Sequence, residues 1–111
     1  RGNPRVGDRY DVLSPAVLRF LSDVAQSCEK AGVPLGLCGE MAGQPLEAMT
    51  LIGLGFRSLS MPPGAIGAVR HMMQRLDAAK LNKRLSSLIH EPDHTVRGAL
   101  AEFAEAEGIA V

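Results

Sequence analysis

The sequence is poor in several features that mark common protein classes. It contains no Trp, one Tyr and three Phe, and its twelve Lys and Arg balance twelve Asp and Glu. Few aromatic rings are therefore available to stack on nucleic-acid bases, and no excess of positive charge attracts a phosphate backbone or an anionic membrane surface. The composition predicts neither a nucleic-acid partner nor a membrane partner.

Long apolar runs and cysteine-rich patterns are missing too. No stretch approaches the roughly 20 apolar residues that a membrane-spanning helix needs, and residues 1–5 are followed by no apolar segment of the kind found in signal peptides. Cys28 and Cys38 are too few for a disulfide framework or for a cysteine-based zinc site. We expect a reducing, cytoplasmic location.

What is present suits one small globular domain, since 46% of the 111 residues are hydrophobic. Ser14 followed by Pro15 is a strong helix start, and Gly32 is a good helix end. Between them a stripe of apolar residues recurs at helical spacing: Val17, Leu21, Val24, Cys28 and Ala31, widened by Leu18 and Ala25. We interpret Cys28 as a packing residue without a function.

The segment from Gly32 to Gly43 organises the rest of the chain. Its apolar residues 33–37 predict a short buried strand. Cys38 and Glu40 follow this strand in a turn where glycine lets the backbone change direction sharply. A lone cysteine in this position is most often a small buried side chain, and Glu40 can serve structure as well as chemistry. Pro45 then begins a helix that is apolar on nearly all sides over residues 45–54 and should be buried.

The remaining sequence predicts a second strand over residues 56–61 and then only helices. The first of these helices is marked by Ile66, Val69, Met73 and Leu76, the next by Leu81, Leu85, Leu88 and Ile89, and the last, capped by Asp93, by Val96, Leu100, Phe103 and Ala104. The order is loop–α–β–α–β–α–α–α. Two strands alternating with helices favour parallel pairing, yet a parallel sheet needs cover on both faces. We therefore predict an α/β fold that forms the C-terminal end of a larger domain.

Other charged or metal-binding patterns have simpler explanations. Residues 90–94 read His-Glu-Pro-Asp-His, which matches a zinc motif, but Pro92 interrupts the continuous helix that the motif requires. We therefore expect no metal site here, and we interpret His71 as a helix surface residue. The charged residues of the opening loop are interpreted as a solvated cluster: Arg1, Arg5, Asp8 and Arg9.

Several motifs together resemble a known family. They are the Arg-Gly-Asn at residues 1–3, the Asp-Arg-Tyr-Asp at 8–11, the Leu-Ser-Pro-Ala-Val-Leu at 13–18, the Leu-Cys-Gly-Glu-Met-Ala-Gly at 37–43, the Leu-Ile-Gly-Leu-Gly at 51–55 and the Ser-Leu-Ser-Met at 58–61. This set resembles the C-terminal end of phosphoenolpyruvate–protein phosphotransferase, enzyme I of the bacterial phosphotransferase systems. The sequence of residues 43–49 and 55–58 is more similar to the nitrogen-related branch of this family than to the sugar-transport branch. Residues 77–111 resemble the family only as a helical tail.

The resemblance implies a (β/α)₈ TIM barrel, of which residues 1–76 would be the last two βα units and residues 77–111 a C-terminal helical tail of the same domain. It implies that Cys38 protonates the enolate of pyruvate, that Arg1 contacts phosphoenolpyruvate, and that Gly39 and Glu40 are candidates for shaping the site. A thiol is mostly protonated at neutral pH, which suits a proton donor. Arginine suits a ligand that carries carboxylate and phosphate groups.

The same resemblance implies parts that this chain does not carry. The ligands of Mg²⁺ and the phosphorylated histidine would lie outside it, so we expect the 111 residues alone to be inactive. A phosphocarrier protein would receive the phosphoryl group, and the whole enzyme would be a homodimer. Two alternatives remain: another phosphoenolpyruvate-using enzyme, such as a dikinase or synthase, and a non-catalytic helical dimerisation module built on residues 77–111.

Overall fold

The computed structural model describes residues 11–92 and 95–111. Its elements follow the chain as α1 (Pro15–Ala31), β1 (Gly36–Cys38), the 3₁₀ helix η2 (Glu40–Gly43), α2 (Pro45–Leu54), β2 (Ser58–Ser60), α3 (Pro63–Met73), α4 (Ala78–Leu88) and α5 (Arg97–Glu107). The predicted order of helices and strands is confirmed, and η2 is the one element that the sequence did not indicate. The fold is a small mixed α/β domain, mostly helical, with one two-stranded parallel sheet.

Most helix ends follow the local sequence signals. The Ser14 hydroxyl accepts a hydrogen bond from the Val17 N–H at 3.3 Å at the start of α1. Gly32 ends the same helix with a φ of 70°, a left-handed conformation that glycine adopts without a steric penalty. The predicted bounds of α2 are confirmed.

The sheet differs from the sequence-based prediction. β1 begins at Gly36 rather than at Val33, which is 54% exposed, and it pairs only with the three residues of β2. The expectation of a buried strand over residues 33–37 was therefore wrong. Pro34 cannot donate a ladder hydrogen bond, and β2 offers a partner only from Ser58 onward.

The two faces of the sheet have different environments. Leu37 and Leu59 lie opposite each other in the register and pack against the helical core, while the alternate positions of both strands are exposed. These exposed positions are small: Gly36, Cys38, Ser58 and Ser60. Helices therefore cover one face of this parallel sheet, and within the described residues the other face has no cover.

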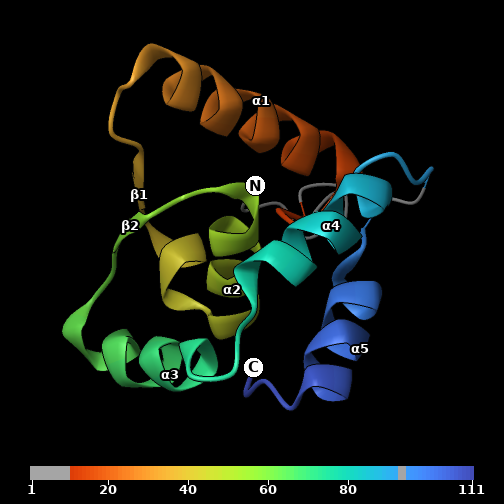
Figure 1. The fold of residues 1–111 in the computed structure, drawn as a ribbon. Helices are drawn as coiled ribbons and strands as arrows, with labels where there is room; N and C mark the ends of the chain where they lie inside the picture. Colours follow the sequence, from red (N-terminus) through yellow and green to blue (C-terminus); the bar gives the residue numbers. More distant parts are fainter. Residues whose placement is uncertain (1–10, 93–94) are drawn as a thin grey trace, which may run out of the picture.

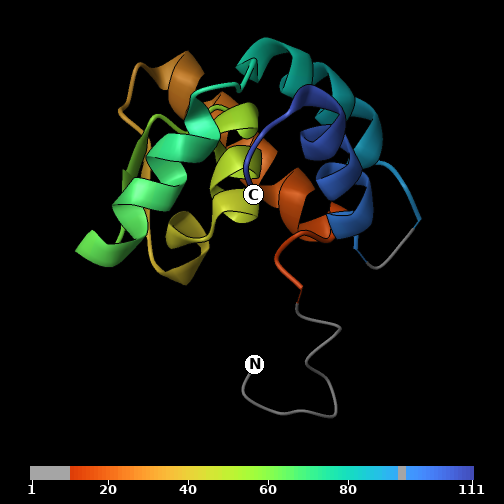
Figure 2. The same ribbon diagram turned by 90° about the horizontal axis from the view of Figure 1, so that it is seen from below.

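The core is centred on α2, as expected from its apolar sequence. Figure 1 shows α2 to the right of the sheet and below α1, and Figure 2 shows it between α3 on one side and α4 and α5 on the other. Gly53 permits a close contact between α2 and α4, because a Cβ atom there would lie 2.7 Å from Leu81 Cγ and Cδ2. Asn82 adds a hydrogen bond of 2.8 Å from its Nδ2 to the Gly53 carbonyl.

Two helices bury only part of their predicted stripes. In α1 Leu18 and Ala25, which widen the predicted stripe, are buried, whereas Ala31 is exposed. In α3 the stripe predicted Met73 as buried, but Met72 is buried and Met73 is 49% exposed. Helical spacing alone does not distinguish between these two adjacent apolar residues. The stripes of α4 and α5 are confirmed in their buried leucines, Leu81, Leu85, Leu88 and Leu100. The predicted cap Asp93 lies outside the described residues.

Candidate functional site

The carboxyl ends of the two strands form the candidate site. Cys38 is the last residue of β1, its register partner Ser60 is the last residue of β2, and both are exposed. Figure 1 shows both strands running in the same direction toward η2 and the start of α3. The thiol is therefore accessible at the edge where parallel α/β folds place their ligands.

The turn after Cys38 depends on glycine. Gly39 has a φ of 130° and a ψ of −174°, a conformation that residues with a side chain rarely adopt. Its carbonyl accepts a hydrogen bond from the Ala42 N–H at 3.2 Å, which closes the 3₁₀ turn. Gly43 lets this turn approach α3, because a Cβ atom there would lie 3.3 Å from Ala65 Cβ. Glu40, exposed, is the first residue of the turn.

The predicted site residues are only partly brought together. Cys38, Gly39 and Glu40 are consecutive and share the exposed end of the sheet. Cys38 is a free cysteine in the described part of the chain. Arg1 lies outside the described residues, and its role stays a prediction.

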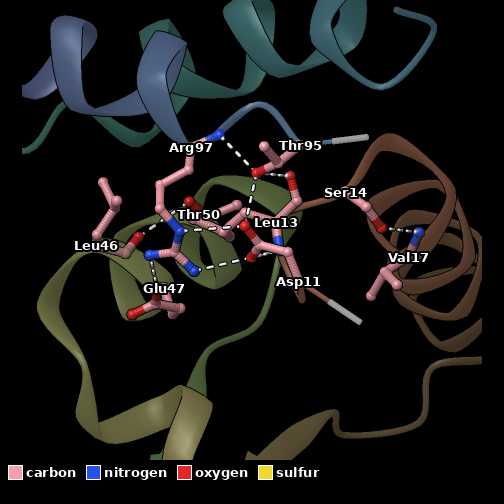
Figure 3. A network of polar contacts seen from close by, with 9 residues as sticks. All are labelled: Asp11, Leu13, Ser14, Val17, Leu46, Glu47, Thr50, Thr95 and Arg97. Atoms are coloured by element: carbon pink, nitrogen blue, oxygen red, sulfur yellow. Dashed lines mark hydrogen bonds and ion pairs between the residues drawn. The ribbon is translucent and has the colours of Figure 1, made fainter. Parts of the chain in front are cut away.

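A polar network that the sequence did not reveal joins three distant segments (Figure 3). Arg97, the first residue of α5, reaches Asp11 with hydrogen bonds of 2.9 Å from Nη2 to Oδ1 and 3.3 Å from Nε to Oδ2. Its Nη1 atom pairs with Glu47 Oε1 in the first turn of α2. Thr95 also donates to Asp11 Oδ2, at 2.7 Å.

The charges in this network stabilise each other. Burial raises the pKa of Asp11, but hydrogen bonds from Arg97, from the Leu13 N–H and from Thr95 outweigh it, so that this pKa falls to about 2. The hydrogen bond with Asp11 is the largest influence raising the pKa of Arg97, which stays charged. The local signal was Glu47, the one charged residue of α2. Its partner is 50 positions away, a separation that no local pattern reveals.

A cavity of about 530 Å³ lies beside β2, between the end of α2 and α3. Its lining is mostly apolar, and Ile66 and Met73 of α3, which are 38% and 49% exposed, form part of it. Ser60 lines it as well, whereas Cys38 does not. The cavity is thus a neighbour of the thiol site and extends along the outer edge of β2.

The described residues provide no metal centre and no membrane span. Across 11–92 and 95–111, no three His, Cys, Asp or Glu side chains are grouped so that they could hold a metal ion. α4 ends at Leu88, before the His90–Pro92 segment, so this part of the zinc-like motif is not on a continuous helix. In the same ranges no helix has the length and apolar character to cross a bilayer.

Comparison with known proteins defines the class of protein to which the chain belongs. Residues 1–78 match the family model described as "PEP-utilising enzyme, PEP-binding domain", and the chain belongs to this family. The match includes the whole thiol turn and ends at the start of α4.

Two relatives extend the likeness into the helical tail. A protein of Salmonella typhimurium named "Phosphoenolpyruvate-dependent phosphotransferase system" is 44% identical over 112 residues, and one of Escherichia coli with the same name is 41% identical over 110. Each alignment covers 98% of this chain and 15% of the relative. A "Phosphoenolpyruvate-protein phosphotransferase" of Borreliella burgdorferi is 32% identical over 81% of the chain. The chain thus spans about a sixth of the relatives' length.

Proposed function

We propose that this chain is the C-terminal part of a phosphoenolpyruvate–protein phosphotransferase and supplies its proton donor, Cys38. The observation that carries the proposal is the exposed thiol at the carboxyl end of β1, directly before a turn that requires glycine at position 39. The family match covers this turn, and the named relatives are phosphotransferases. These names favour a phosphotransferase over a dikinase or synthase and over a non-catalytic helical module.

The proposed step is a proton transfer. When the P–O bond of phosphoenolpyruvate breaks, the phosphoryl group passes to a histidine elsewhere in the enzyme and the enolate of pyruvate remains. The Cys38 S–H then gives its proton to the methylene carbon, which forms the C–H bond of pyruvate and leaves a thiolate. The thiolate regains a proton from water. The exposure of Cys38, which is a free cysteine, supports its role as the proton donor.

Other parts of the reaction are assigned partly to residues outside the described ranges. Arg1 is proposed to contact the substrate, and Gly39 and Glu40 to shape the site around the thiol. Mg²⁺ is proposed for the full-length enzyme, but the described residues do not supply its ligands, so no step is assigned to it here. We expect the phosphoryl group to pass on to a phosphocarrier protein, and the chain alone to be inactive.

The larger architecture is proposed as a TIM barrel in a cytoplasmic homodimer. The uncovered sheet face and the strand edges support the barrel, because parallel strands are normally covered on both faces and continued by neighbours. The cavity beside β2 would then lie where the barrel continues. Cys28 and Cys38, both free thiols, support the reducing location.

Substitution of Cys38 in the full-length protein tests the proposal. Cys38→Ala removes the proton donor, so phosphorylation of the histidine should continue at a reduced rate while stereospecific protonation of the product is lost. The measurement is the configuration of methyl-labelled pyruvate formed in isotopic water. Cys28→Ala, which removes the half-buried cysteine of α1, is the matched control and should leave the configuration unchanged. Pyruvate of one configuration formed at the normal rate by Cys38→Ala would show that this cysteine is structural.

A further inference from the structure

The turn that follows Cys38 is attached at both ends to the connection between β2 and α3. Cys38 lies opposite Ser60 in the sheet register, at the end of both strands. Gly43, the last residue of η2, lies against this connection, because a Cβ atom there would be 3.3 Å from Ala65 Cβ and 3.6 Å from Met61 Cβ. The same short stretch of chain therefore contacts the turn where it begins and where it ends.

Close packing explains the glycine at position 43. A positive φ occurs at Gly39 but not at Gly43, so the backbone conformation at Gly43 is open to residues with a side chain. A side chain would lack room instead, since 3.3 Å is shorter than the best separation of two carbon atoms that are not bonded. The two glycines of the turn thus serve different purposes: Gly39 permits a backbone conformation, and Gly43 permits a contact.

A change of rotamer cannot relieve a clash at this contact. Ala65 has no side-chain torsion that moves its Cβ atom, and its N–H is bonded to the Pro62 carbonyl at 2.9 Å in the first turn of α3. Within the turn Ala42 is fully buried, and its N–H donates to the Gly39 carbonyl at 3.2 Å. A methyl group at position 43 should therefore displace the turn from α3 by a few tenths of an ångström. Only four residues lie between this position and Cys38, so the displacement should reach the thiol.

We propose that Gly43 is a positioning residue for the proton transfer: by letting η2 lie against Ala65, it sets the position of the Cys38 thiol at the end of the sheet. The inference rests on the proposed function, because it takes Cys38 as the proton donor. It assigns to Gly43 no contact with the substrate and no part in the phosphorylation of the histidine. Proton transfer and phosphoryl transfer should therefore respond differently when the contact between Gly43 and Ala65 is changed.

The stereochemistry of the product formed by the full-length protein tests the inference. Gly43→Ala should slow stereospecific protonation about fivefold while phosphorylation of the histidine stays within about twofold, because only the proton donor is displaced. Adding Ala65→Gly leaves Met61 Cβ, at 3.6 Å, as the nearest atom to the new methyl group, so the double variant should recover wild-type protonation. Gly67→Ala is the matched control, because it adds a methyl group to α3 where nothing lies within 4 Å. Its products should equal those of the wild type.

Amide hydrogen exchange of the full-length protein gives a second measurement, which does not depend on activity. The Ala42 N–H should exchange about tenfold faster in Gly43→Ala and return to the wild-type rate in the double variant with Ala65→Gly. The Phe56 N–H, which donates to the Leu51 carbonyl at the end of α2, should keep its rate in both variants. Normal protonation by Gly43→Ala, or protonation that Ala65→Gly does not restore, would overturn the inference.

Failure of the proposed function would give a different result. If Cys38→Ala still forms pyruvate of one configuration at the normal rate, the thiol is not the proton donor, and exchange at Ala42 alone then decides whether Gly43 positions the turn. If Cys38→Ala loses the configuration but Gly43→Ala keeps it at the normal rate, the proposed function stands and the positioning role of Gly43 is wrong.

Discussion

Asp11 illustrates how one residue can couple charge to stability. It accepts hydrogen bonds from the Arg97 guanidinium, the Thr95 hydroxyl and the Leu13 N–H, and its carboxylate lies in the same network as Glu47. These donors favour the ionised form of the carboxyl group, and the resulting pKa is about 2 instead of the ordinary 3.8. A depressed carboxyl pKa contributes stability above the unfolded-state value and loses it as the pH falls through the folded-state value.

Asp11→Asn should therefore destabilise the chain in a pH-dependent way. Near neutral pH we expect a loss of about 1–3 kcal/mol in the free energy of unfolding, since hydrogen bonds to a charged group are lost. The difference between wild type and variant should stay constant down to about pH 5 and shrink as the pH falls from 3.8 toward 2. Urea unfolding of both proteins across this range measures it. Carboxyl groups outside this network titrate alike in both proteins and cancel in the difference, so a stability difference that does not narrow would contradict the assignment to Asp11.

At the scale of elements, the contact between α2 and α4 depends on the absence of a side chain at Gly53. Gly53→Ala would place Cβ 2.7 Å from Leu81 and 2.8 Å from Leu85 Cδ1, both of which are buried. The gain in helix propensity of about 1 kcal/mol should be outweighed by an overpacking cost of about 1–3 kcal/mol. We expect a net loss of stability, measured by the urea midpoint.

Gly67 offers the matched control for this substitution. It lies inside α3, and a Cβ atom there would meet nothing within 4 Å. Gly67→Ala should therefore stabilise the chain by about 0.5–1 kcal/mol, because only helix propensity changes. If both substitutions changed the free energy of unfolding by the same amount, the α2–α4 contact would be able to relax without a loss of stability.

The elements themselves were largely predictable from local signals. The Ser14 cap, the prolines at the helix starts and the glycines at positions 32, 55 and 108 fixed helix ends through chemistry that acts within a few residues. The strand bounds were not predictable, since a parallel strand extends only where a partner exists, and β2 begins at Ser58. The thiol turn was found from its sequence, whereas the Arg97 network was not, because its members are brought together only by the packing of α5.

At the scale of the whole molecule, the surfaces of the described residues are typical of one part of a larger domain rather than of a complete domain. The sheet has one uncovered face and only two strands in the described residues, and an apolar cavity extends along β2. The relatives are much longer, and this chain covers 15% of the first two. We expect these surfaces to be covered by the rest of the protein when the chain is in its full-length context.

The isolated chain should therefore self-associate. Exposed strand edges and exposed apolar side chains favour pairing with a second copy when their usual neighbours are missing. Ile66 and Met73 line one side of the cavity. The double substitution Ile66→Lys and Met73→Lys should therefore weaken association, because it places charge where a second copy would pack. Phe20→Lys is the control, because Phe20 is 66% exposed on α1 and does not line the cavity. Sedimentation over a concentration series should show association in the wild type and in Phe20→Lys but a shift toward monomer in the double variant. A compact wild-type monomer at high concentration would mean that the chain covers its own sheet, and the argument for a missing neighbour would fail.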